Sequence, residues 1–187
     1  WHQVTELPPV LVIVTEHQGH GRTCQACGHV TWSRIPAEVL AHAFGARLTA
    51  AVAYLSGGCH ASKRTIEGIA GTLLGVSLSL GSVVKAEQEV AAALEGPYAE
   101  AEATVRQAAV KNADETGWAL AGKLCWMWMA VTGTAALFKI CLSRGREALG
   151  QLLGGDIHGT VGSDRWGPYG IIDLAARQVC WAHLKRD

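Results

Sequence analysis

The sequence predicts a mixed α/β fold in which a helical region separates a small N-terminal β element from a C-terminal sheet. Apolar residues form 49% of the 187 residues and charged residues form 17%, as in chains that bury a packed core. After Pro36, Ala, Leu and Val recur at helical spacing, whereas from residue 108 short apolar runs alternate with turn signals. This change of period predicts helices first and strands afterwards.

The overall charge argues against a protein that binds nucleic acid over its whole surface. The chain carries 16 Lys and Arg against 16 Asp and Glu, so a chain-wide electrostatic footprint for nucleic acid is absent and any basic surface is local. Six cysteines are too few and too irregularly spaced for a secreted disulfide scaffold, which favours a cytoplasmic location. The longest uncharged run, 124–138, is shorter than the roughly 20 residues of a spanning helix, so we expect no membrane segment.

The N-terminal part, residues 1–35, is expected to contain two short strands and a metal-binding turn. The β-branched run 10–16 predicts the first strand, and residues 29–32 predict the second. Cys24 and Cys27 lie between them in a Cys-x-x-Cys-Gly turn, whose thiolates supply half of a tetrahedral Zn²⁺ site.

Two histidines precede this turn and are candidates for completing the Zn²⁺ coordination. His17 and His20 would point to opposite faces of a strand, so a half site is favoured over a complete Cys₂His₂ site. The remaining cysteines lie in apolar or helical contexts and are expected to be small buried residues: Cys59, Cys125, Cys141 and Cys180.

A helical region is expected over residues 36–107, ending in a connector helix that Pro97 opens. Ser62 is expected to cap a helix that stops at Gly75, and Ser79 is expected to cap the next helix. Two helices separated by a short Gly-containing turn match a helix-turn-helix, although any helical bundle also packs two helices in this way.

Basic residues on this pair of helices are the candidate DNA contacts. Lys63 and Arg64 lie at the start of the first helix and Lys85 lies on the second, where their charges favour phosphate binding. Glu87 and Glu89 on the second helix argue against a strongly phosphate-gripping face.

The C-terminal part, residues 108–187, is expected to begin as a β-meander. A strand should end at Asp114–Glu115, after which the chain turns through Gly117–Trp118. Strands at 124–131 and 135–141 should then follow, joined by a Thr-Gly-Thr turn.

An alternation of helices and strands should complete this part. Ser143 is expected to cap a helix that Gly154–Gly155 ends. A strand at 160–163, a helix at 171–176 and a strand at 178–181 are then expected.

Two aspartates follow predicted strands and form a candidate metal site. An unpaired buried carboxylate is costly, so Asp114 and Asp164 should reach water, a partner or a metal. If their strands are neighbours, about 4.8 Å apart, both carboxylates can reach one Mg²⁺ (or Mn²⁺), the cations of phosphodiester chemistry. Alternatively, Asp114 begins a hairpin turn with Gly117, and Asp164 caps a loop before Pro168. Glu115 should point to the opposite face and be solvated or structural.

Motifs in the second half resemble, in the same order, transposases of the insertion sequence sixty-six family. An upstream block and the helical region after it are similar to the zinc-binding and helix-rich segments of that family. The combination is specific, although DET or SDRW alone would be weak. The blocks are VTEHQGHGRTCQACGHVT at 14–31, ADETGW at 113–118, SRGREAL at 143–149, GSDRWGPY at 162–169 and QVCWAHLKRD at 178–187.

The resemblance implies an RNase H-like catalytic core in which three carboxylates hold divalent metal for DNA cleavage and strand transfer. Asp114 matches the first acid and Asp164 the second, whereas the third is a glutamate well beyond the CWAHL block and the sequence ends at Asp187. We therefore expect a fragment that is inactive alone. It would comprise a truncated zinc-binding segment, a helical DNA-binding region and the N-terminal part of the core.

The resemblance also implies partners and a reaction. The partners would be the terminal inverted repeats of an insertion sequence, target DNA and further copies of the protein in a synaptic complex, with Zn²⁺ in the full-length protein. Water activated at the metal would hydrolyse one strand, and the freed 3′-hydroxyl would attack target DNA. Two rivals remain open: a non-enzymatic DNA-binding relic, and a metal-dependent nuclease of the same fold that cuts without joining.

Overall fold

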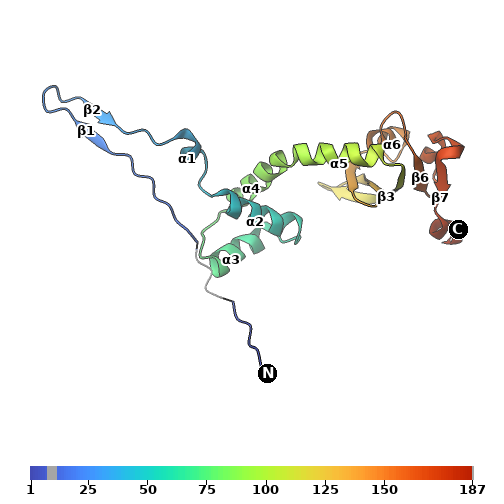
Figure 1. The fold of residues 1–187 in the computed structure, drawn as a ribbon, viewed down its shortest axis with the longest axis horizontal. Coiled ribbons are helices and arrows are strands. Elements are labelled where there is room, and N and C mark those ends of the chain that lie inside the picture. Colours follow the sequence, from blue (N-terminus) through green and yellow to red (C-terminus); the bar gives the residue numbers. More distant parts are fainter. Residues whose placement is uncertain (8–11, 187) are drawn as a thin grey trace. The chain divides into compact units, whose positions relative to one another are not determined.

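The structure is a computed structural model that describes residues 1–7 and 12–186. The chain divides into two compact units, Trp1–Leu94 and Glu95–Asp187 (Figure 1). Each unit has its own cluster of buried apolar side chains. Helices precede a mixed sheet along the chain, so the predicted mixed α/β class is confirmed.

The first unit begins with a small antiparallel hairpin. Strand β1 (Gly21–Thr23) pairs with β2 (Val30–Trp32), which confirms the strand expected at 29–32. The strand expected at 10–16 is wrong for residues 12–16, which form no strand, and the rest of it lies outside the described residues. β-Branched residues favour extended backbone, but a strand also needs a partner for its hydrogen bonds.

Helices follow the hairpin, and local signals position several of their ends. The Ser62 and Ser79 hydroxyls accept hydrogen bonds from Thr65 and Ser82 backbone N–H groups, both at 3.1 Å, so both predicted caps are confirmed. Gly75 has φ +66°, the left-handed stop expected there. The helices are α1 (Ala37–Ala41), α2 (Ala46–Gly57), α3 (Lys63–Leu73) and α4 (Leu80–Ala93).

The helices of the first unit pack around a core contributed by α2, α3 and α4. Residues from all three helices and one residue of the linker between α3 and α4 are buried: Val52, Ile66, Ala70, Leu78, Val83 and Ala86. The stretch Ala37–Gly57 is apolar enough, with mean hydropathy 1.2, to cross a membrane by length and composition. However, it is interrupted between α1 and α2, and Val52 on α2 packs in this core.

The second unit contains, among the described residues, a five-stranded mixed sheet in the order β5-β4-β3-β6-β7. The strands β3, β4 and β5 form the predicted antiparallel meander, and β6 and β7 add in parallel on the other side of β3. The strands are β3 (Val110–Leu120), β4 (Lys123–Val131), β5 (Ala136–Cys141), β6 (Thr160–Ser163) and β7 (Arg177–Val179).

The C-terminal elements depart from two expectations. The helix expected at 171–176 is wrong, because two short 3-10 helices, η1 (Gly167–Ile171) and η2 (Leu174–Ala176), occupy this region. The strand expected at 178–181 begins one residue earlier as β7 and stops at Val179, and helix α7 (Trp181–Arg186) follows.

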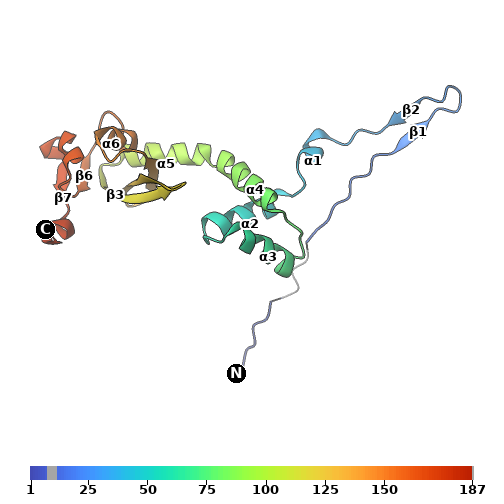
Figure 2. The same cartoon turned by 180° about the vertical axis from the view of Figure 1, so that it is seen from behind.

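One face of the sheet is covered by helices α5 (Glu95–Gln107) and α6 (Arg146–Leu153), which lie beside it in both ribbon views (Figure 2). The helix predicted as a connector therefore packs with the sheet. The cap expected at Ser143 is wrong, because Gly145 is the N-cap residue of α6. The Ser143 hydroxyl instead accepts a hydrogen bond from the Gly145 N–H at 2.9 Å. The buried core includes Val105, Trp128, Leu137, Leu149, Leu152, Val161 and Tyr169.

Candidate active site

Asp114 lies in the middle of a long strand rather than at its end. Strand β3 continues to Leu120, with Asp114 opposite Met129 of β4, so the turn predicted at Gly117–Trp118 is wrong. The chain turns at Ala121 and Gly122, which have φ +50° and +75°. The pairing with β4 keeps the backbone extended beyond the carboxylate because each residue in between has a cross-strand partner.

Asp164 directly follows β6, which is the parallel neighbour of β3. Their register runs from Val110 opposite Thr160 to Asn112 opposite Gly162. Asp114 and Asp164 each lie two residues beyond the last pair of this register, so the same register, if continued, would set them level on one face of the sheet. The predicted adjacency of the two strands is therefore confirmed, and neighbouring strands lie about 4.8 Å apart.

A cleft of about 230 Å³ opens on this face of the sheet. Asp114, Asn112 and Gly162 line it together with His183. The Asn112 amide lies so close to Gly162 that a Cβ at position 162 would collide with its Oδ1 atom. A glycine at this position lets the Asn112 side chain lie against β6.

Each aspartate has one carboxylate oxygen held by a backbone N–H group. The N–H of Glu115 donates to Asp114 Oδ1 at 3.0 Å, and the N–H of Trp166 donates to Asp164 Oδ1 at 2.8 Å. Among the described residues, no hydrogen bond reaches the second oxygen of either carboxylate. Both side chains are partly exposed, so these oxygens are available to a ligand.

Glu115 adjoins Asp114 but lies on the core face of the sheet, as strand geometry predicts. It is buried rather than solvated, because its carboxylate pairs with Arg144 at 2.9 Å and accepts from the Tyr169 hydroxyl at 2.7 Å. Burial raises the pKa of Glu115 above its ordinary value, and these two partners oppose the rise. Glu115 is therefore structural in this arrangement.

Cys180 and His183 also line the cleft, although the sequence analysis did not include them in the site. Cys180 is half-buried rather than fully buried, and the backbone N–H of His183 is the main cause that lowers the pKa of its thiol. The Nδ1 atom of His183 is buried and has no hydrogen-bond partner among the described residues. The CWAHL motif contains both residues, but only the parallel pairing of β6 with β7 brings them to Asp114.

The two cysteines that were expected to form half of a Zn²⁺ site lie in the hairpin of the first unit. Cys24 and Cys27 lie exposed in the turn between β1 and β2, and Gly28 follows with φ +71°. Backbone N–H groups of Cys27 and Ala26 lower the pKa of the Cys24 thiol, which favours the thiolate that binds metal. No group of three or more His, Cys, Asp or Glu in the described part of the chain could hold a metal, and His17 and His20 therefore do not complete this site.

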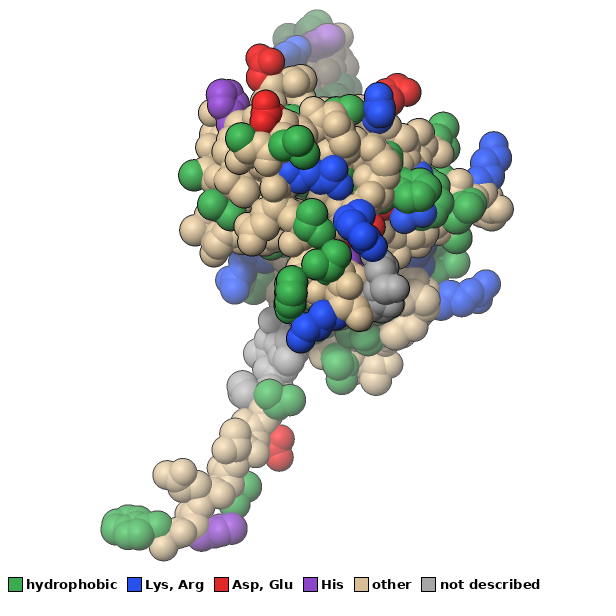
Figure 3. Space-filling view, turned by 90° about the vertical axis from the view of Figure 1, so that its right-hand side faces the viewer, with side chains coloured by type: hydrophobic (Ala, Val, Ile, Leu, Met, Phe, Trp, Pro, Cys, Tyr) green, Lys and Arg blue, Asp and Glu red, His purple; other side chains and the backbone are tan. Residues whose placement is uncertain are grey.

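The three candidate DNA contacts differ in their surroundings. Lys63 pairs with Glu87 at 2.9 Å, and Lys85 lies 3.7 Å from Glu89. Arg64 is exposed at the start of α3 and has no ion pair with another described residue. Figure 3 faces the C-terminal unit instead, where Lys and Arg side chains are dispersed among hydrophobic ones.

The sheet and its carboxylates define the class of this protein: a mixed α/β protein with one aspartate on β3, beside a cleft, and a second aspartate directly after the parallel neighbour β6. A family model described as Transposase IS66 family matches residues 42–187. The chain therefore belongs to the IS66 family of transposases, and the resemblance in its motifs is confirmed. The Cys24–Cys27 hairpin lies outside the matched residues.

Family membership indicates a function in DNA transposition, and this function implies that the protein binds DNA. Transposases of this class generally use divalent metal ions. A comparison with curated proteins finds no match for the chain.

Proposed function

We propose that this protein is a DDE-type transposase in which Asp114 and Asp164 are two acids of a metal-dependent site for DNA cleavage and strand transfer. The observation that supports the proposal is the parallel register of β3 and β6, whose continuation by two residues would set the two carboxylates level on one face. The β5-β4-β3 meander with parallel β6 beside β3 is compatible with the RNase H-like core that the family resemblance implies.

The donor set suits a divalent cation. Carboxylate oxygens are hard ligands that favour Mg²⁺ or Mn²⁺, and Asp114 and Asp164 each have one oxygen without a protein partner among the described residues. These two side chains would hold the ion, which in such sites stabilises the charge that develops on a phosphate during displacement. Asn112, which lines the same cleft, can donate an amide hydrogen bond to a phosphate oxygen there.

DNA would also contact the first unit. Lys63, Arg64 and Lys85 are the proposed phosphate contacts of a helix-turn-helix-like pair, α3 and α4. Residues 74–79 connect these helices, a longer connection than the three- or four-residue turn of that motif. The ion pairs of Lys63 and Lys85 would exchange for phosphates on binding, which makes affinity salt-dependent.

The wider setting follows from the same proposal. The DNA partners are the terminal inverted repeats of the element and its target, and several copies of the protein assemble on them in the cytoplasm. The thiolates of Cys24 and Cys27 would provide half of a zinc knuckle, with Zn²⁺ in the complete protein.

A nicking and strand-transfer assay on the full-length gene product tests the catalytic assignment, with DNA that carries the inverted repeats flanking the gene. In the presence of Mg²⁺, Asp114→Asn and Asp164→Asn should each abolish nicking and joining, because each removes a charged ligand. Asp156→Asn is the matched control: Asp156 is exposed in a loop of the same unit, and this variant should keep both activities. Full activity in a folded Asp114→Asn or Asp164→Asn variant would refute the assignment, and nicking without joining by the unchanged protein would identify a nuclease.

A DNA-binding protein without catalysis is the second candidate. The first unit has its own buried core, so it can present α3 and α4 to DNA whatever the sheet unit does. This candidate predicts salt-dependent binding to inverted-repeat DNA that Arg64→Ala weakens, with no Mg²⁺-dependent product. Nicking that requires both aspartates would exclude it.

A further inference from the structure

A cluster of side chains on the core face of the sheet surrounds Arg144, which belongs to the SRGREAL motif. Arg144 lies in the connection between β5 and α6 and is partly exposed. Its guanidinium pairs with one carboxylate and lies over two indole rings. We define the Arg144 cluster as Glu115, Trp126, Arg144, Trp166 and Tyr169.

At one end of the cluster, Arg144 contacts β3 through Glu115. Its Nε atom donates to Glu115 Oε1 at 3.0 Å, and its terminal nitrogen lies 2.9 Å from the same oxygen. The other oxygen, Oε2, accepts from the Tyr169 hydroxyl, which stays protonated because burial and the nearby Glu115 raise its pKa. The Glu115 side chain is 1% exposed, so both of its oxygens are satisfied by protein groups in place of water.

At the other end, Arg144 contacts the segment that follows β6. The guanidinium carbon lies 4.2 Å from the centre of the Trp166 ring and 4.6 Å from that of Trp126. A planar cation that lies over two aromatic rings gains cation–π attraction from both rings. The Trp166 indole N–H also donates to the Arg144 carbonyl at 3.4 Å, so side chain and backbone both join these residues.

Two of the three residues that contact Arg144 also hold the aspartates through their backbone N–H groups. Glu115 donates its N–H to Asp114 Oδ1, and Trp166 donates its N–H to Asp164 Oδ1. A continuous path of contacts therefore runs from one carboxylate to the other through Arg144. We propose that Arg144 is a positioning residue, which sets the separation and orientation of Asp114 and Asp164 for a shared divalent cation. This inference rests on the proposed metal site.

Arginine chemistry suits this role better than lysine chemistry would. A guanidinium can direct two nitrogens at Glu115 while its flat faces contact Trp126 and Trp166, whereas an ammonium is a point charge without a face. Because the three contacts are made at once, movement of β3 relative to the loop after β6 would break at least one of them.

The test measures the Kd for Mn²⁺ of the whole chain, from the electron paramagnetic resonance signal of free Mn²⁺, with circular dichroism as the check on folding. Asp114→Asn and Asp164→Asn first establish that the bound ion occupies the proposed site. Arg144→Met is expected to raise the Kd by about 10- to 100-fold, the loss typical of an outer partner of metal ligands. Arg144→Lys should give an intermediate Kd, because it keeps the charge without the planar group.

Two further variants separate positioning from general loss of stability. Leu137→Ala creates a cavity in β5, away from the Arg144 cluster, and should leave the Kd unchanged although it destabilises the same core. The double substitution Glu115→Met with Arg144→Met removes both charges of the ion pair together and should fold, because paired removal leaves no uncompensated charge. It should weaken Mn²⁺ binding as Arg144→Met does.

The outcomes distinguish this inference from the proposal beneath it. If the aspartate variants lose Mn²⁺ binding but folded Arg144→Met, or the double variant, keeps the wild-type Kd, the positioning role is refuted and the metal site stands. If Leu137→Ala weakens binding as much as Arg144→Met, the effect is one of stability and the role is likewise refuted. If the unchanged chain binds no Mn²⁺, or binds it equally well after Asp114→Asn, the metal site and the positioning role both fall.

Discussion

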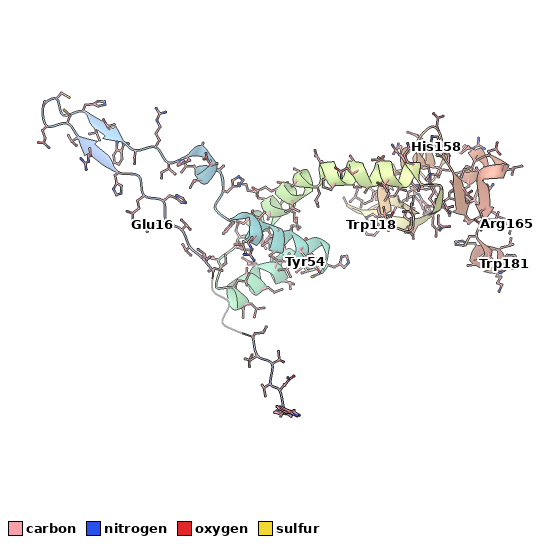
Figure 4. All side chains as sticks on the ribbon, viewed as in Figure 1. Glu16, Tyr54, Trp118, His158, Arg165 and Trp181 are labelled. Atoms are coloured by element: carbon pink, nitrogen blue, oxygen red, sulfur yellow. The ribbon has the colours of Figure 1, made fainter. Side chains whose placement is uncertain are left out.

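Replacing Lys111 with methionine tests how the sheet is attached to helix α5. Lys111 is completely buried on the core face of β3, and its ammonium donates to the Arg106 carbonyl at 2.6 Å and the His158 carbonyl at 2.8 Å. The Arg106 carbonyl lies in the last turn of α5, where carbonyls have no helical partner and a cation is favourable. His158, labelled in Figure 4, lies in the loop that precedes β6.

The expected loss follows from these two bonds. Lys111→Met keeps the apolar stem but leaves the Arg106 and His158 carbonyls, both part-buried, without the ammonium donor, each costing about 1–3 kcal/mol. Removal of a buried charge offsets part of that cost, so we expect a net destabilisation of about 2–4 kcal/mol at pH 7. The measurement is the free energy of unfolding from urea titration. Lys123→Met is the matched control, because Lys123 is exposed beside the β3–β4 turn, and it should change stability by less than about 0.5 kcal/mol.

The pH dependence adds a second test with a definite sign. Burial lowers the pKa of Lys111 below its ordinary value of 10.5, so the unfolded chain binds more protons than the folded chain between the two pKa values. Stability of the wild type relative to Lys111→Met should therefore rise with pH in that window. A loss below about 1 kcal/mol at pH 7, or a difference that shrinks towards pH 10, would refute the role given to this lysine.

Three further predictions concern the sheet unit, each measured by urea unfolding. Trp128→Ala removes a completely buried ring and should destabilise the protein by about 3–5 kcal/mol, and a loss below 1 kcal/mol would contradict its place in the core. Gly162→Ala should be destabilising because the new methyl group collides with Asn112, and Asn112→Ala should relieve that cost; equal costs in both backgrounds would show that the close approach is absent. Tyr169→Phe leaves a Glu115 oxygen without its donor at a cost of about 1–3 kcal/mol. Because burial already raises the Glu115 pKa above 4.5 and the hydroxyl opposes this, the variant should lose more stability as pH rises from 4 to 7, and a pH-independent difference would contradict it.

Local signals in the sequence predicted the features that depend on neighbouring residues. The caps at Ser62 and Ser79 are hydrogen bonds across three residues, and the Thr132 turn between β4 and β5 is similarly local. The period of apolar residues predicted the meander, and the motifs predicted the family. Predictions failed where pairing decided the outcome: β3 continues past Asp114 because β4 pairs with it up to Leu120.

Only the tertiary structure decided which side chains meet. Asp114 lies on β3 and Asp164 directly after its neighbour β6 because these two strands pair in parallel, which no local pattern of residues encodes. The contacts of Arg144 with Glu115 and Trp166 likewise join residues far apart in the chain. Sequence alone determined the types of elements and the candidate acids, because backbone hydrogen bonds and periodicity are local. Strand order, register and buried ion pairs depend on packing between distant segments, whose free energy exists only once the sheet and its helices have assembled.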